Sequence, residues 1–498
     1  MERLKKELTL CVRARYPLLY LLTFEENRAE GVINEIGKTL SKEVVSWTFS
    51  RGFDPAQEPQ RDSTKPEEAL KLIIQSPKKA IFVLKDFHPF LERELVVRLM
   101  RDLSHHLKRS YKTVILVSPS LKIPPELEKD LSVFDLPLPD SGELAEVLTQ
   151  LIAPYRNSNK VNVDLSPEVT EKVVQATLGL TRNEAENVYA KALIRERNFG
   201  VHDIPEIILE KQQLIRKSGI LNFINLSTQM KDVGGLGELK KWLRQRSRAF
   251  SAQARDYGLP EPKGLLLLGV QGCGKSLAAK AIAAEWNLPL LRLDVGKIFN
   301  SFVGDSEQNM RRAIFQAEAM SPTVLWLDEI EKGFSGTTSS GSVDAGVTAR
   351  VFATFLTWMQ EKVKPVFVIA TSNNIAELPP ELFRKGRFDE IFFIDLPDLQ
   401  EREQIFRIHI QAKKRDPGQY DLVRFAMVSE SFSGAEIEQA VVSAMYSAFP
   451  EDREFTSEDI LNAVEETVPL AVTAKESVDR LRLWAKNRAR PASHSLVT

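Results

Sequence analysis

The chain has 498 residues, which at roughly 150 residues per domain indicates about three globular units. Its 67 lysines and arginines nearly balance its 68 aspartates and glutamates, so no general basic field marks it as a binder of nucleic acid or membrane surfaces. Cys11 and Cys273 are its only cysteines, which excludes a disulfide framework and a metal cluster built on cysteines, and fits a reducing compartment such as the cytoplasm.

The first residues, MERLKKELTL, are charged and contain no continuous apolar stretch, so we expect no signal peptide. A membrane-spanning helix needs about eighteen or more consecutive apolar residues, and no later uncharged apolar run is that long. The longest apolar runs have the length of buried strands, and each is followed by polar residues and a helical pattern. This alternation predicts an α/β architecture.

In the first half, strands are predicted at residues 18–22, 81–84 and 114–117. They follow the strand, loop and helix order of a parallel α/β sheet. We therefore expect an α/β domain at residues 1–150, followed by a helical lid and linker at residues 151–225.

The second half shows the same alternation more clearly. Strands are predicted at residues 265–268, 290–293, 323–327, 365–371 and 390–395, and helices at 275–286, 307–319 and 347–360. From about residue 401 the pattern is helical alone, at 436–449 and 457–468 among others. The sequence predicts a large α/β domain at 226–397, a small helical lid at 398–474, and a basic helix and tail at 475–498.

Residues 269–276 read GVQGCGKS and stand between a predicted strand and a predicted helix. A glycine-rich loop in this setting points backbone N–H groups at phosphates, and the helix directs its positive end toward them. Lys275 is expected to reach the β- and γ-phosphates, and the Ser276 hydroxyl to coordinate magnesium. The sequence therefore predicts a site for ATP with Mg2+.

Asp328 and Glu329 follow the apolar strand at 323–327, at the end of a strand where open α/β sheets hold their ligands. Asp328 is expected to hold the Mg2+ shell, and Glu329 to orient or deprotonate the attacking water. The alternative is a pair of carboxylates that caps the next helix.

The C-terminal tail is basic around the apolar residues Leu481, Leu483 and Trp484. We predict a helix that packs its apolar side on the lid or on the next subunit. A contact with nucleic acid or acidic lipid is the alternative.

The two halves share short strings in the same order. Residues 114–127 parallel residues 366–382, and FDLPLPD at 134–140 parallels FIDLPD at 393–398. We interpret this similarity as a tandem duplication with divergence. The alternative is that any two α/β domains share such short strings.

The chemistry is absent from the first copy. TFEENR at residues 23–28 has no glycine and no lysine, and Glu25 and Glu26 would repel a triphosphate. FVLKDF at 82–87 keeps an aspartate but not the following glutamate. We expect a degenerate, non-hydrolysing domain that serves partner recognition or ring assembly.

Residues 229–470 resemble the ATPase module of AAA+ proteins, in the branch with the second region of homology. DVGG at 232–235 is similar to the entry segment beside the adenine, and LFRKGRFD at 382–389 to the segment with two arginine fingers. The resemblance implies nucleotide contacts from Asp232, Val233, Gly234, Gly269, Val270, Gln271, Gly272, Cys273, Gly274, Lys275, Ser276 and Leu277.

The same resemblance implies three further catalytic residues. Asn373 would contact the γ-phosphate or the attacking water, while Arg384 and Arg387 would reach the nucleotide of the neighbouring subunit. An arginine supplied by a neighbour implies a homo-oligomeric ring, expected to be a hexamer.

SFVG at residues 301–304 resembles the pore loop whose aromatic grips a polypeptide, with Phe302 as the gripping residue. The alternative is an ordinary buried aromatic. A second loop at 336–342 is polar and would face the same pore or lie on the surface.

At some positions the chain departs from the residues typical of AAA+ proteins. Cys273 stands where the family often has threonine or another small residue, and a redox-sensitive thiol is an alternative reading. Ala435 stands where other AAA+ branches place an arginine sensor, and the sequence contains no zinc-protease motif. The whole arrangement resembles an AAA+ family of cyanobacteria and algal plastid genomes, which would place a plastid-encoded member in the stroma.

Two classes of function follow from these expectations. The first is a ring that uses ATP hydrolysis to remodel a protein substrate. The second is an ATP-dependent switch or scaffold for a partner bound by the N-terminal half. Action on nucleic acid is disfavoured by the net charge of -1.

Overall fold

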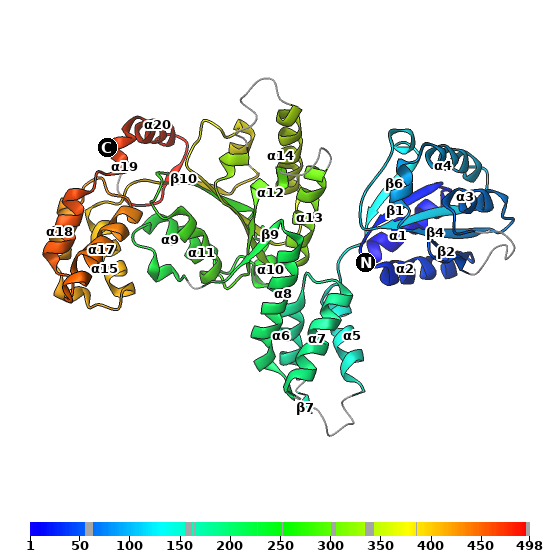
Figure 1. The fold of residues 1–498 in the computed structure, drawn as a ribbon, viewed down its shortest axis with the longest axis horizontal. Coiled ribbons are helices and arrows are strands. Elements are labelled where there is room, and N and C mark those ends of the chain that lie inside the picture. The colour runs from blue at the N-terminus through cyan, green and yellow to red at the C-terminus, as the bar shows by residue number, and fades with distance from the viewer. Residues whose placement is uncertain are drawn as a thin grey trace. The chain divides into compact units, whose positions relative to one another are not determined.

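The computed structural model describes residues 1–54, 63–154, 162–163, 166–196, 198–226, 228–250, 252–299, 305–333, 343–384 and 386–494. The chain divides into two compact units, Met1–Asp203 and Ile204–Thr498 (Figure 1). Each unit combines an α/β sheet with a group of helices that follows it in the sequence.

The first unit is built on a sheet in the order β3-β2-β4-β5-β1-β6. Neighbouring strands run parallel except β2 and β3, which are antiparallel. Strands β1, β4 and β5 are apolar along nearly their whole length because helices cover both faces of the sheet. The strands are β1 (Leu18–Leu22), β2 (Glu43–Thr48), β3 (Gly52–Asp54), β4 (Ala80–Lys85), β5 (Thr113–Ser118) and β6 (Leu131–Asp135).

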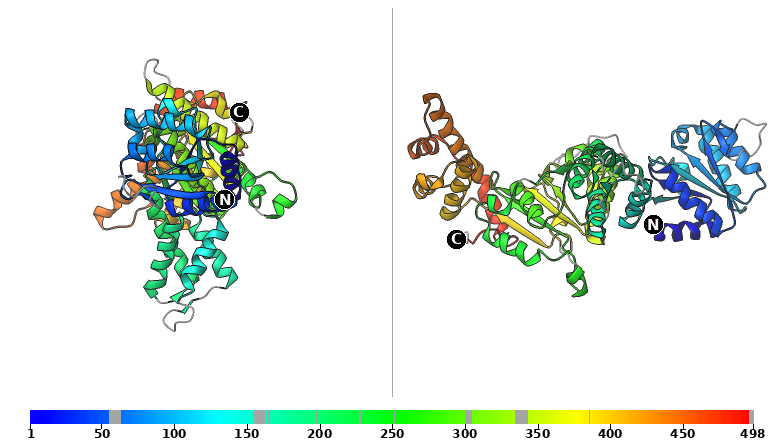
Figure 2. Two further views of the ribbon diagram at one scale, coloured as in Figure 1. Left: turned by 90° about the vertical axis from the view of Figure 1, so that its right-hand side faces the viewer. Right: turned by 90° about the horizontal axis from the view of Figure 1, so that it is seen from below.

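Helices lie on both faces of this sheet (Figure 2). One apolar cluster joins α1 and α2 to Leu19 and Leu21, and another joins α3 and α4 to Leu18 and Tyr20. Helices α5, α6 and α7 follow the sheet and form the lid of the first unit. Two short strands in this lid, β7 and β8, pair in parallel. The bounds are α1 (Glu2–Arg13), α2 (Glu26–Thr39), α3 (Pro66–Gln75), α4 (Glu94–Leu107), α5 (Ser141–Ile152), β7 (Asn162–Val163), α6 (Pro167–Thr177), α7 (Arg182–Glu196) and β8 (Asn198–Phe199).

The second unit has a larger sheet in the order β15-β14-β10-β13-β12-β11-β9. Its central strands are parallel, and β9 pairs with β11 in the antiparallel direction at one edge. The predicted strands are present, whereas β9 and β15 were not predicted. The strands are β9 (Leu221–Ile224), β10 (Gly264–Gly269), β11 (Leu290–Leu293), β12 (Thr323–Leu327), β13 (Val366–Ser372), β14 (Glu390–Ile394) and β15 (Arg490–Pro491).

Helices cover both faces of the second sheet, and the lid is a separate group of helices with its own apolar core around Phe406 and Phe425 (orange in Figure 2). The helices are α8 (Ile204–Ser218), α9 (Gly237–Arg246), α10 (Ala252–Asp256), α11 (Lys275–Glu285), α12 (Val295–Phe299), α13 (Asp305–Ala319), α14 (Val343–Glu361), α15 (Leu399–Ala412), α16 (Leu422–Val428), α17 (Gly434–Ala448), α18 (Ser457–Glu466), α19 (Leu470–Thr473) and α20 (Lys475–Ala485).

The C-terminal helix α20 is present, and within this chain it packs on the large domain and not on the lid, the first of the two predicted positions. Leu481 and Ala485 are buried in the core of the large domain with Leu382 and Phe393. The guanidinium of Arg482 donates to both carboxylate oxygens of Asp395, at 2.9 to 3.0 Å. The chain therefore returns to the large domain after the lid, and β15 joins the edge of the sheet.

The two sheets have the same strand order. Read from one edge, β6-β1-β5-β4-β2 of the first unit corresponds to β14-β10-β13-β12-β11 of the second, and an antiparallel strand follows in each. The fold class is therefore the tandem α/β arrangement predicted from the sequence, and the shared order supports the interpretation as a duplication.

Candidate nucleotide-binding site

The phosphate loop connects β10 to α11 and depends on its glycines. Gly269 has φ 153°, and a Cβ there would lie 1.9 Å from the carbonyl oxygen of Ile394. Gly272 has φ 79°, and a Cβ there would lie 2.8 Å from the Ser433 hydroxyl. Helix α11 begins at Lys275 without a side-chain cap, so its first N–H groups remain available to an anion.

Lys275 is buried in the loop, with 6% of its surface exposed. Its Nζ donates to the carbonyl oxygens of Gly269 and Val270, at 3.0 and 2.6 Å. Burial lowers the pKa of Lys275 to about 8, against the opposing effect of nearby acidic groups that include Asp328 and Glu329. The site therefore holds a cation that is poorly solvated and suited to phosphate oxygens.

Asp328 accepts two hydrogen bonds from hydroxyl groups. Ser276 Oγ donates to Asp328 Oδ1 at 2.9 Å, and Thr371 Oγ1 donates to the same oxygen at 2.7 Å. Sequence reasoning paired Ser276 with Asp328 and missed Thr371, which is on β13. One carboxylate and one hydroxyl fit Mg2+, which keeps several waters and takes phosphate oxygens as its other ligands.

A complete metal cage is not built from protein side chains here. Among the described residues, no group of three or more histidines, cysteines, aspartates and glutamates could hold a metal ion. This donor set fits an ion that arrives with a nucleotide, since the phosphates supply the remaining charged ligands.

Glu329 and Asn373 meet beside this carboxylate. Asn373 Nδ2 donates to Glu329 Oε1 at 3.3 Å, and Lys332 forms an ion pair with the other oxygen of Glu329. The backbone N–H of Asn373 is held by Glu331 at 3.0 Å. The two polar side chains therefore lie together at the carboxyl ends of β12 and β13.

Arg384 and Arg387 follow the short helix Pro380–Phe383. Arg387 donates to the carbonyl oxygen of Glu381, and Arg384 is exposed. In the part of the chain that the structure describes, no hydrogen bond or ion pair joins either arginine to the phosphate loop, to Asp328 or to Glu329.

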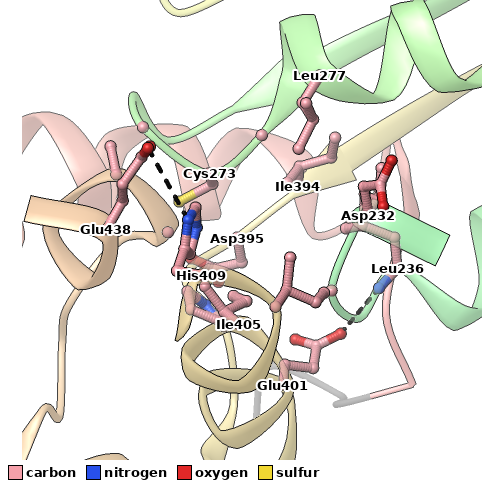
Figure 3. A pocket seen from close by; sticks show the side chains of 18 residues that line it. Asp232, Leu236, Cys273, Leu277, Ile394, Asp395, Glu401, Ile405, His409 and Glu438 are labelled. Carbon is pink, nitrogen blue, oxygen red and sulfur yellow. Dashed lines mark hydrogen bonds and ion pairs between the residues drawn. The ribbon is translucent and has the colours of Figure 1, made fainter. Parts of the chain in front are cut away.

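A cavity of about 240 Å³ lies between the phosphate loop and the lid (Figure 3). It is bounded by the predicted residues Asp232, Val233, Gly234, Gly272, Cys273, Gly274 and Leu277, and by further residues that were not predicted as contacts: Leu236, Ile394, Asp395, Pro397, Glu401, Ile405, Ile408, His409, Gly434, Ala435 and Glu438. Apart from Leu236, the unpredicted residues come from β14, from the connection between β14 and α15, and from the lid, all far from the phosphate loop in sequence.

Two polar groups of the lid face this cavity. His409 Nδ1 and Glu438 Oε1 lie 3.9 Å apart (Figure 3). Burial lowers the pKa of His409, although Glu438 opposes the shift, so the imidazole is neutral at neutral pH. A neutral ring and a carboxylate are suited to hydrogen bonds with a neutral polar ligand group rather than with phosphate.

The entry segment at 232–235 is fixed to lid helix α15. Leu236 N donates to Glu401 Oε1 at 3.0 Å, and Gly235 N donates to Gln404 Oε1 at 3.1 Å. A Cβ on Gly235, whose φ is 65°, would lie 2.2 Å from Glu401 Oε1. The lid therefore contacts the segment that was expected beside the adenine.

Cys273 faces the same cavity. Burial raises the pKa of its thiol to about 12, so almost no thiolate is present at neutral pH. A protonated thiol fits the small-side-chain interpretation better than a redox role.

In the first unit, the position equivalent to the Mg2+-site residue Asp328 carries a lysine. Leu22 pairs with Ser118 as Leu268 pairs with Ser372, and this register places Lys85 where the second unit has Asp328. The aspartate kept in the first copy, Asp86, thus stands at the position of Glu329, not of Asp328 as the sequence comparison suggested. Lys85 forms ion pairs with Glu26 and Glu30, at 3.6 and 2.8 Å.

The connection between β1 and α2 is closed by its own side chains. Glu25 accepts from Arg28 Nη1 at 3.0 Å and from the backbone N–H of Arg182 at 2.6 Å. Arg28 also pairs with Glu143 of α5 at 2.7 Å. Burial raises the pKa of Glu25, while Arg182 and Arg28 oppose that shift. A buried carboxylate thus occupies the region between strand and lid.

Two predictions fall on parts of the chain that the structure leaves out. Phe302 with its loop at 301–304, and the loop at 336–342, lie outside the described residues. Among the helices that are described, none has the length and apolar character needed to span a membrane.

Comparisons with known proteins place both units in one family. Family models match three parts of the chain: SpoVK-like AAA ATPase, N-terminal domain, at residues 4–136; SpoVK-like AAA ATPase, second domain, at 142–218; and ATPase family associated with various cellular activities (AAA) at 265–396.

Individual relatives cover nearly the whole chain. The AAA domain-containing protein ycf46 of Pyropia yezoensis is 44% identical over 98% of this chain and 99% of its own length. That of Trieres chinensis is 42% identical over 99% of both chains. The proteasome-activating nucleotidase of Aeropyrum pernix is 34% identical over 47% of this chain and 59% of its own length.

Proposed function

Because the chain belongs to the AAA ATPases, in the group of the ycf46 AAA-domain proteins, we propose that it works as a Mg2+-dependent ring that remodels a protein. ATP hydrolysis follows from the family, which the sequence resemblance identified correctly. The Mg2+ dependence, the ring and the kind of substrate are the parts of the proposal that need tests.

The observation that carries the proposal is the hydrogen-bonded set Ser276, Asp328 and Thr371 beside the buried Lys275. Lys275 would bind the β- and γ-phosphates, and Ser276 with Asp328 would hold Mg2+. When bound, Mg2+ would neutralise phosphate charge. Thr371 would keep the Asp328 carboxylate in one orientation.

Glu329 and Asn373 are the pair that would act on the attacking water. A carboxylate at this position accepts the water's proton, and the Asn373 amide keeps the carboxylate oriented by its bond to Oε1. The cavity between loop and lid would take the nucleoside, with Asp232, Val233 and Gly234 on its wall.

The ring proposal rests on Arg384 and Arg387. They belong to a segment that resembles the arginine fingers of the family, and within the described residues they make no bond to this chain's own phosphate loop. We propose that they serve a neighbour's nucleotide in a homohexamer.

Remodelling is favoured by the similarity of the second half to a nucleotidase named for proteasome activation. Phe302 would then grip the substrate. The second candidate is a switch or scaffold for a partner held by the first unit. The charges of the first unit favour it: Lys85 stands where the second unit has Asp328, and α2 begins at Glu26 as α11 begins at Lys275. That unit is therefore free to serve protein contacts instead of phosphate.

We also propose the domain limits given by the sequence. They are a degenerate α/β domain at 1–150, a lid and linker at 151–225 whose last strand β9 pairs with the second sheet, the ATPase domain at 226–397, its lid at 398–474, and a C-terminal segment at 475–498 that packs on the ATPase domain. The substrate or partner is a protein rather than nucleic acid. The cytoplasm, or the plastid stroma for a plastid-encoded chain, is the proposed location.

The first test is steady-state ATP hydrolysis with and without Mg2+. Lys275→Ala is expected to abolish nucleotide binding, because it removes the phosphate-binding cation. Glu329→Gln is expected to bind ATP but turn over at least 100-fold more slowly, the usual scale for loss of a general base. Wild-type turnover no faster than that of Glu329→Gln would sink the proposal.

The second test concerns the first unit in the intact chain. Calorimetric titration of Lys275→Ala with ADP is expected to show no binding heat, because Glu25 and Lys85 leave no phosphate site in the first unit. Binding at micromolar ADP in this variant, with the second site disabled, would contradict the degeneracy of the first unit.

A further inference from the structure

The last described residues return to the nucleotide pocket. We call residues 490–494 the C-terminal strap. Its strand β15 pairs with β14, and Ala492 N donates to the carbonyl oxygen of Phe393 at 2.9 Å. Ala492 is buried at 1% exposure. The strap is therefore fixed on the edge of the sheet, next to the strand that leads into the lid.

The strap also completes the start of helix α9. The residue before this helix, Leu236, has left-handed backbone angles and offers no side-chain cap. The carbonyl oxygen of Ala492 instead accepts from the backbone N–H groups of Glu238 and Leu239, at 2.9 and 3.1 Å. These N–H groups would otherwise lack partners in the helix. The strap thus caps the helix that follows the entry segment at 232–235.

Side chains strengthen this attachment. Glu238 accepts from Arg490 Nη2 at 2.7 Å and lies 2.9 Å from His494 Nδ1. The hydrogen bond from Arg490 is the main cause that lowers the pKa of Glu238. The strap and the first turn of α9 are thereby joined by backbone hydrogen bonds and by ion pairs.

Glu401 connects the strap to the pocket itself. Its Oε1 accepts from Ser493 Oγ at 2.6 Å and also from Leu236 N at 3.0 Å (the latter drawn in Figure 3). Glu401 is 8% exposed and lines the cavity between loop and lid. One oxygen atom therefore joins the lid helix, the entry segment and the strap.

We propose that the C-terminal strap is a positioning element for the nucleotide, in which Ser493 orients Glu401 and so fixes Leu236 and the entry segment against the lid. Ser493 is not among the residues that line the cavity, and it acts through Glu401. The inference rests on the proposed nucleotide site, because it assigns the strap to ATP affinity and not to the chemical step.

Steady-state hydrolysis with full-length Ser493→Ala tests this role. The KM for ATP and the Kd for ADP are expected to rise roughly tenfold, the scale of one hydrogen bond to a charged group, while kcat stays near the wild-type value. Ser493→Thr restores the hydroxyl and is expected to restore the KM. Ser447→Ala removes a hydroxyl that bonds within lid helix α17, at the carbonyl of Ser443, and is the matched control with unchanged KM.

The outcomes separate the two proposals. Unchanged KM and Kd in Ser493→Ala, with an active wild type, would overturn the positioning role and leave the ATP site intact. A purely structural role would lower Tm or kcat with no change in KM, which also overturns it. A wild type that neither binds nor hydrolyses ATP would overturn the proposed function and this inference together.

Reciprocity gives an independent readout. If the strap raises nucleotide affinity, then bound ADP must stabilise the strap by the same factor. ADP is therefore expected to slow trypsin cleavage after Arg488, just before the strap, in the wild type, and to slow it less in Ser493→Ala at equal saturation. Equal protection in both proteins would contradict the coupling.

Discussion

Lys275 illustrates the cost of keeping a phosphate-binding cation in a closed loop. Its ammonium is buried, and its pKa is lowered to about 8 from the ordinary 10.5. Because the folded state disfavours the charged form, the unfolded chain binds more protons between these two values. The free energy of unfolding should therefore rise with pH from about 8 to 10.5.

Without nucleotide, Lys275→Met is expected to stabilise the second unit at pH 7, by a free energy on the order of 3 kcal/mol. The methionine keeps most of the volume and removes the buried charge. Scanning calorimetry at pH 7 and pH 10 measures the change in Tm, and the gain should shrink at pH 10. A lower Tm for the variant at both pH values would contradict this account.

The residues of a local motif could be predicted, and their distant partners could not. GVQGCGKS placed Lys275 and Ser276, because the chemistry needs those types at that spacing. Thr371 was missed although it bonds to the same carboxylate oxygen as Ser276. A threonine in an apolar strand carries no signal of this kind, and its role depends on the strand register.

At the level of elements, the parallel core was predictable because each strand is an apolar run followed by a helix. The edge strands β9 and β15 were not, since β15 is only two residues long and β9 lies in a segment expected to be lid and linker. Helix α20 is held on the large domain by buried Leu481 and by the ion pair between Arg482 and Asp395, and no spacing in the sequence marks such contacts.

Two neighbouring leucines of α20 test its position. Leu481 is 8% exposed in the core of the large domain, and Leu483 is 77% exposed. Leu481→Ala should lower the free energy of unfolding by about 2 to 4 kcal/mol through the cavity it leaves, whereas Leu483→Ala should change it by less than about 0.5 kcal/mol. Denaturant unfolding of both variants is the measurement. Equal effects would show that α20 does not pack on this core.

At the scale of the whole molecule, the proposed ring makes each active site depend on two chains. Lys275→Ala would lose its own nucleotide but keep Arg387, and Arg387→Ala would bind nucleotide without the finger. An equimolar mixture is therefore expected to hydrolyse ATP faster than either variant alone. Co-purification of the two variants, each carrying a different affinity tag, would confirm that mixed oligomers form.

A matched control for the mixture is Lys275→Ala with Glu329→Gln. The second variant binds nucleotide but lacks the group that acts on water, so a neighbour's arginine cannot restore its turnover. Complementation in this control, or none with Arg387→Ala despite mixed oligomers, would argue against a finger supplied by the neighbour.

Asp86 and Glu329 share one further property: both have φ 49° at the tip of equivalent strands. Backbone strain of this kind is often attributed to catalysis, yet the first unit has the same bend although residues 23–28 contain no glycine and no lysine. The conformation therefore belongs to the way the strand leaves the sheet. In evolutionary terms, the equal φ angles of Asp86 and Glu329 support common descent of the two units, although their motifs differ.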